Sequence, residues 1–97
     1  MNVDKEHIIS YFQDIIHICE KTTNGNVSHQ MSNISITYSY IADKVKEQYG
    51  ENIAYNNLMH VVELASGATT GNITHKVATI KGLCRRCIDF INEYGLE

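Results

Sequence analysis

Two short segments of this chain, residues 22–29 and 69–75, carry nearly the same polar side chains. Each combines an asparagine, a hydroxyl residue and a histidine, in the order Asn-Val-Ser-His or Asn-Ile-Thr-His. Amide, hydroxyl and imidazole groups at the start of a helix could bind a carboxylate, a phosphate or an acidic side chain of a partner. The candidate binding residues are therefore Asn26, Ser28, His29, Asn72, Thr74 and His75.

The same residue types also have a purely structural use. Asparagine, serine and threonine cap helices by accepting a backbone N–H bond, as Asn26 or Ser28 would for the helix that follows. Capping explains the amides and hydroxyls of both segments but explains the two histidines less well. Ser28 and His29 point about 100° apart on a helix, so they do not form a nucleophile and base pair. We predict no catalytic residue.

Both segments belong to an internal repeat that fills nearly the whole chain of 97 residues. The two histidines lie 46 positions apart, and the same offset joins Ile34 to Ile80. A repeat of this kind indicates a duplicated structural unit. We expect a single helical domain made of two similar units, residues 4–49 and 50–95.

Apolar side chains recur at three- and four-residue intervals in four stretches, which predicts four helices. We expect the helices at about residues 3–20, 26–49, 52–66 and 72–94, with Gly50, Gly67 and Gly95 at helix ends. The predicted buried residues are Ile8, Phe12, Ile15, Ile16, Cys19, Met31, Ile34, Tyr38, Ile41, Val45, Ala54, Leu58, Val61, Val62, Ala65, Val77, Ile80, Leu83, Cys84, Cys87, Ile88 and Ile91.

One stretch has the local pattern of a strand. Residues 32–40 alternate between polar and apolar and are rich in β-branched side chains. The equivalent residues 78–86 follow a helical period, and duplicated units should share a fold, so we predict helix for both.

A helical hairpin with one apolar face cannot bury that face alone. Two similar hairpins therefore predict an all-α four-helix bundle with pseudo-two-fold symmetry. Side-by-side packing of the hairpins, as in a fragment of a solenoid, is the alternative. In an up-and-down bundle, the two duplicated segments would lie at the same end.

Cys84 and Cys87 form a C-x-x-C motif on one face of a helix. Zinc would require two more ligands, and Cys19 and His75 are the candidates by residue type. A redox motif of this form normally opens a helix after a strand, whereas this one lies in mid-helix. Because the repeat aligns both cysteines with core positions, we predict buried thiols, no metal and no other cofactor.

Composition narrows the class of partner. The net charge is −3, the isoelectric point is about 5.9, and no basic cluster exceeds Arg85-Arg86, which disfavours nucleic acid. The polar N-terminus and the short apolar runs predict neither a signal peptide nor a membrane span, and hence a cytoplasmic location.

We therefore expect a non-enzymatic, cytosolic protein that binds another protein, as an inhibitor, immunity protein, antitoxin or adaptor would. Six tyrosines support this expectation, because tyrosine is enriched at protein interfaces. A small anion- or metal-binding protein that uses the duplicated loops is the alternative. A homodimer that completes its packing between two chains is a further option.

Overall fold

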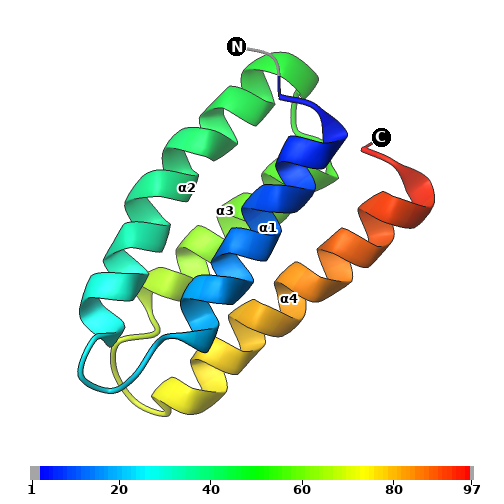
Figure 1. The fold of residues 1–97 in the computed structure, drawn as a ribbon. Coiled ribbons are helices and arrows are strands. Elements are labelled where there is room, and N and C mark those ends of the chain that lie inside the picture. The colour runs from blue at the N-terminus through cyan, green and yellow to red at the C-terminus, as the bar shows by residue number, and fades with distance from the viewer. Residues whose placement is uncertain (1–2, 97) are drawn as a thin grey trace.

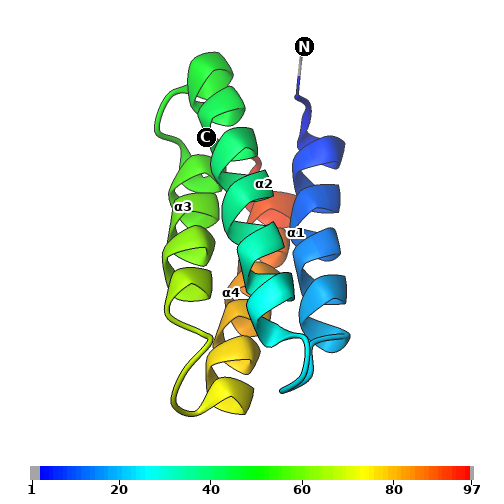
Figure 2. The same cartoon turned by 90° about the vertical axis from the view of Figure 1, so that its left-hand side faces the viewer.

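The computed structural model describes residues 3–96, which form four helices and no strand. The helices are α1 (Lys5–Glu20), α2 (Val27–Tyr49), α3 (Ile53–Ser66) and α4 (Ile73–Tyr94). They run alternately up and down and pack as a four-helix bundle (Figures 1 and 2). The predicted all-α fold class is confirmed, and residues 32–40 are helical.

Local chemistry sets most of the helix ends. Asp4, Asn52 and Asn72 each accept the backbone N–H three residues on, at 2.9, 2.9 and 3.1 Å, and so satisfy a donor that a helix start leaves free. The N–H donated to Asp4 also holds the pKa of that carboxyl below its usual range. Gly50 and Gly95 end α2 and α4 with φ of 77° and 81°, which a residue with a Cβ rarely adopts.

Buried side chains recur along the chain at the same spacing as the sequence repeat. Five of the predicted core residues are only half-buried, namely Ile16, Ile41, Val62, Leu83 and Ile88, and Ala42 is fully buried beside Ile41. Eight pairs of buried side chains lie 46 positions apart: Ile8 and Ala54, Phe12 and Leu58, Ile15 and Val61, Cys19 and Ala65, Met31 and Val77, Ile34 and Ile80, Tyr38 and Cys84, Val45 and Ile91.

The closest helix packing joins the two halves of the sequence. α2 packs mainly on α3, and α1 packs mainly on α4, whereas α1 and α2 touch only slightly. A pseudo-two-fold axis that exchanges α1 with α3 and α2 with α4 also exchanges the two main pairs. Each helix–loop–helix unit therefore buries its apolar face chiefly against the other unit.

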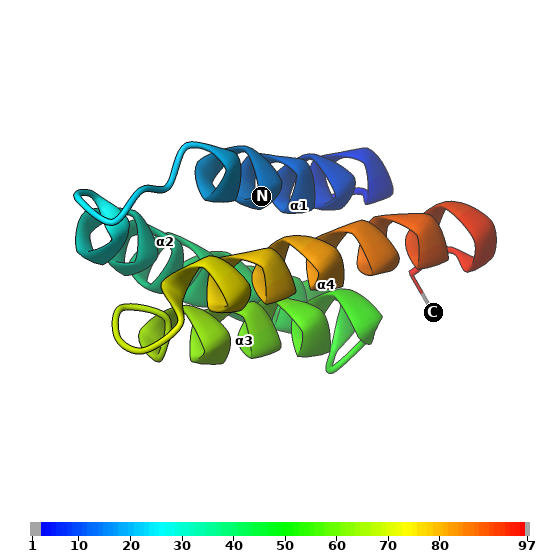
Figure 3. The same ribbon diagram turned by 90° about the horizontal axis from the view of Figure 1, so that it is seen from below.

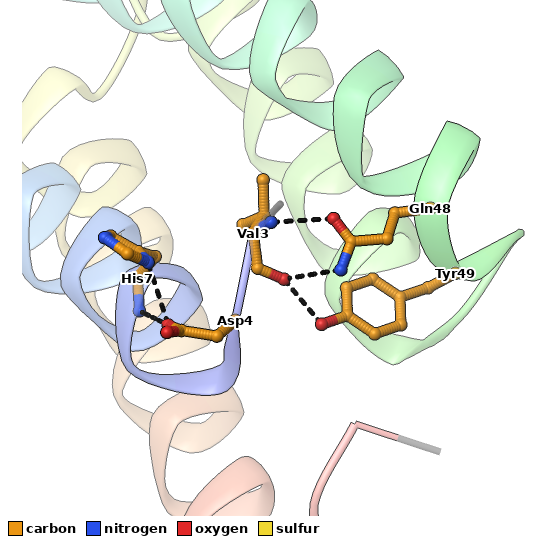
Figure 4. A network of polar contacts seen from close by, with 5 residues as sticks. All are labelled: Val3, Asp4, His7, Gln48 and Tyr49. Carbon is orange, nitrogen blue, oxygen red and sulfur yellow. Dashed lines mark hydrogen bonds and ion pairs between the residues drawn. The ribbon is translucent and has the colours of Figure 1, made fainter. Parts of the chain in front are cut away.

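A polar clamp holds α1 to α2 at the end away from their loop (Figure 4). The Val3 N–H donates to Gln48 Oε1 at 2.7 Å, and Gln48 Nε2 donates to the Val3 carbonyl at 3.0 Å. The Tyr49 hydroxyl donates to the same carbonyl. These bonds join the segment before α1 to the end of α2, where the two helices contact each other little.

Candidate functional site

The duplicated polar segments lie at one end of the bundle, in the loops of residues 21–26 and 67–72. Figures 1 and 3 show both loops at the end opposite the start of α1, the end of α4 and the short α2–α3 connection. This placement follows from the up-and-down topology. It brings the start of α2 and the start of α4, with their candidate binding residues, to the same end of the molecule.

The side chains of the two asparagines in these loops make different hydrogen bonds. Asn72 caps α4 by accepting the His75 N–H, whereas the Asn26 side chain makes no such bond to α2. The Asn26 amide turns back into its own loop, where it accepts the Thr23 N–H at 2.7 Å and donates to the Lys21 carbonyl at 3.0 Å. The sequence allows Asn26 or Ser28 as the cap of α2. Asn26 holds the N-cap position but does not cap through its side chain, because the loop backbone binds both ends of the amide, and Ser28 lies within the first turn of the helix.

The loop of residues 67–72 is held by a lysine side chain, whereas the loop of residues 21–26 is held by an asparagine. Lys76 Nζ donates to the carbonyls of Gly67 at 3.0 Å and Thr70 at 2.7 Å. A cation in the first turn of a helix is disfavoured by the helix dipole, but here the ammonium extends backward over the end of α3, where carbonyls are free. The equivalent residue of the first repeat is Gln30, so that repeat has no lysine at this position.

Both candidate histidines are exposed to solvent. His29 Nε2 lies 3.4 Å from the side-chain nitrogen of Asn33, one turn further along α2. His75 takes part through its backbone: its N–H donates to Asn72, and its carbonyl accepts from the Thr79 hydroxyl at 2.9 Å. Neither histidine lines either of the two pockets described next.

Among the pockets at the loop end, two lie at equivalent positions of the two repeats. The larger, about 410 Å³ and here called the Lys81 pocket, lies between the first loop and α4. The smaller, about 300 Å³ and here called the serine pocket, lies between α2 and the end of α3. The Lys81 pocket is lined by Cys19, Glu20, Thr22, Thr23, Asn24, Ile73, Thr74, Val77, Ala78 and Lys81, and the serine pocket by Ser28, Met31, Ser32, Ser35, Ala65, Ser66 and Thr69.

An offset of 46 maps all seven residues of the serine pocket onto residues of the Lys81 pocket. The copies differ in charge, since Ser35 corresponds to Lys81 and Ser66 corresponds to Glu20. Of the predicted binding residues, Thr74 and Ser28 line these pockets at equivalent positions. Lys81 and Glu20 were not predicted as site residues, although comparing the repeats position by position marks both as places where a charge replaces a serine.

The Lys81 pocket has an uneven distribution of charge. Glu20 Oε2 lies 3.8 Å from Arg85, and Glu20 Oε1 lies 4.0 Å from the His17 ring. Burial raises the pKa of the Cys19 thiol in the pocket wall to about 11, and the nearby Lys81 charge opposes that rise. Lys81 itself is half-buried.

All three cysteines are buried and free, as predicted for the C-x-x-C motif. Burial raises the pKa of Cys87 to about 12 and that of Cys84 further still, so both remain protonated thiols near neutral pH. Within residues 3–96, no cluster of three or more His, Cys, Asp or Glu side chains is placed to hold a metal ion.

A different surface feature lies on the side of α2 that faces away from the core. We call it the α2 stripe. Its apolar centre consists of Ile36, which is 71% exposed, and Tyr40, which is 63% exposed. Exposed polar residues continue it in both directions along the helix; the full set is His29, Asn33, Ile36, Tyr40, Asp43 and Glu47. A smaller exposed pair, Phe90 and Tyr94, lies near the end of α4 with ring centres 4.7 Å apart.

Comparisons with protein-family models, with curated proteins and with solved structures gave no match for this chain. None of the helices in residues 3–96 combines the length and the apolar character that crossing a bilayer requires.

Proposed function

We propose that this chain is a non-enzymatic protein-binding module of the cytoplasm, of the inhibitor, immunity, antitoxin or adaptor type. The observation that carries the proposal is the apolar centre of the α2 stripe. Ile36 and Tyr40 lie one turn apart in the middle of α2, the longest helix of the bundle, and both face water. Neither side chain contributes to the core.

Burying this pair against a partner would supply binding free energy. Removing a large apolar side chain from water contributes about 1.5–3 kcal/mol. Stable interfaces place such side chains at a centre and surround them with polar groups. The α2 stripe has this order, because His29 and Asn33 precede the apolar pair and Asp43 and Glu47 follow it.

The charges of the α2 stripe favour a particular kind of partner. Lys44 lies beside Tyr40, with its Nζ 5.3 Å from the ring centre, and 3.7 Å from Glu47 Oε2. The positive charge of Lys44 balances only one of the two carboxylates, Asp43 and Glu47, near the C-terminal part of the α2 stripe. We propose a partner that offers an apolar cleft with a basic edge, because complementary charge speeds association and aligns the two surfaces.

Affinity capture with two matched double variants tests the proposal. Ile36→Ser with Tyr40→Ser removes the centre of the α2 stripe, and Phe90→Ser with Tyr94→Ser removes a comparable exposed pair from α4. We expect the wild-type chain and the α4 variant to capture the same protein in a stoichiometric complex. The α2 variant should lose that protein.

Both pairs are exposed, so circular dichroism should show both variants folded, and any loss of capture can then be assigned to the surface. Capture that survives in the α2 variant, or that is lost equally in both variants, contradicts the α2 stripe as the binding surface. Recovery of only the free chain from native extract under varied conditions contradicts the proposed function itself.

A further inference from the structure

The Lys81 pocket holds a cation without a partner in the described part of the chain. Among residues 3–96, the ion pairs are His7 with Asp4, His17 with Glu20, Lys44 with Glu47, and Arg85 with Glu20. The Lys81 ammonium takes part in none of them. Glu20, the one acid that lines the pocket, has Arg85 as its nearby cation, so Lys81 is the one cation that lines this space and it has no ion-pair partner there.

The pocket also offers room and hydroxyl groups. Its volume of about 410 Å³ lies in the range of small-molecule sites, which is roughly 300–1,000 Å³. The Thr23 hydroxyl accepts the Asn26 N–H at 3.3 Å, which leaves its own proton available for donation. On α4, Ala78 lies between Thr74 and Lys81, and its short side chain leaves the space between them open.

The serine pocket separates the effect of the lysine from that of the fold. Both pockets include the first turn of a helix, hydroxyl residues and a buried apolar residue, because duplication placed them at equivalent positions. Of these two, only the Lys81 pocket is lined by charged residues. A helix start alone would make the two copies equivalent, so any difference in their binding must come from the positions that have diverged.

We propose that the Lys81 pocket binds a compact oxyanion, a carboxylate or a phosphate, with Lys81 as its counter-charge and Thr23 and Thr74 as hydroxyl donors. The serine pocket does not bind it. The Lys81 pocket shares no residue with the α2 stripe, so the oxyanion site is independent of the proposed protein-binding function. This proposal assigns anion binding to Lys81 rather than to the two duplicated histidines.

Amide chemical shifts of the full-length chain can report on both pockets in one experiment. We would titrate the protein with succinate and, separately, with inorganic phosphate, at constant ionic strength. We expect saturable shifts of the Thr23, Thr74 and Ala78 amides, while the Ser28 and Ser32 amides of the serine pocket stay in place. The anion with the lower Kd identifies the chemical source of the oxyanion.

Lys81→Ser, which introduces the residue that the other repeat carries, should weaken binding by about tenfold or more, because it removes a charge-assisted contact. Lys5→Ser at the start of α1 makes the same charge change away from the pocket and should leave the Kd unchanged. Equal shifts in both pockets, unchanged binding by Lys81→Ser, or no saturable shift with either anion would overturn the proposal.

Discussion

The two repeats of this protein have similar buried side chains but differ at the residues of the loop end. In the core, apolar side chains recur 46 positions apart along all four helices, although their sizes differ, as with Phe12 and Leu58. At the loop end, the same offset joins Asn26 to Asn72, two identical residues with different hydrogen bonds. It also joins Ser35 to Lys81, two different residues in equivalent pockets.

This contrast shows which constraints act on each region. A buried position must stay apolar because both repeats contribute to one shared core, and a polar group there would lose its hydrogen bonds to water. A loop or pocket position has no such requirement, since solvent can satisfy whatever side chain it carries. Loop and pocket positions are therefore where the two copies are free to differ.

Equivalent core positions should be comparably important for stability. Phe12→Ala and Leu58→Ala each empty a site that is fully buried in the bundle. We expect a loss of about 3–5 kcal/mol for the phenylalanine and about 2–5 kcal/mol for the leucine, from lost transfer energy and the cavity left behind. Urea unfolding at 25 °C measures both losses. A loss below about 1 kcal/mol for either variant would show that one repeat contributes little to the common core.

The two loop asparagines should give smaller and unequal effects. Asn72→Ala removes the cap of α4 and should cost about 1 kcal/mol, whereas Asn26→Ala affects only exposed loop bonds and should cost about half as much. Hydrogen exchange should locate the difference, at the His75 amide for Asn72→Ala and at the Thr23 amide for Asn26→Ala. Faster exchange at the first amides of α2 in Asn26→Ala would indicate that Asn26 caps that helix after all.

Much of this fold could be predicted from the sequence because the repeat and the apolar period carry the same information. The strand-like pattern of residues 32–40 is resolved by its helical counterpart, and the glycines that end α2 and α4 are local signals of helix ends. The buried state of the C-x-x-C motif follows from its alignment with core positions. These features depend on which side of a helix faces the core, and periodicity reports that side directly.

Less of the candidate site could be predicted from the sequence by the same reasoning. Asn26 has the residue type of a cap, but its amide is used by the Thr23 and Lys21 backbone, and local sequence does not reveal that competition. Lys81 is one of several helix lysines until the packing of α1 on α4 places it beside Glu20 and the first loop. The helical period leaves Ile36 and Tyr40 off the buried face of α2, but it does not show whether another element covers them.

Reciprocal packing of the two repeats is what places each loop-end pocket, and solution NMR can test it directly. Nuclear Overhauser contacts should join the Thr23 methyl group to Ala78 across the Lys81 pocket, and the Thr69 methyl group to Ser32 across the serine pocket. Observing both sets would establish the duplicated arrangement at the loop end. Finding neither set, with the first loop instead in contact with the α2–α3 connection around Gly50, would contradict it.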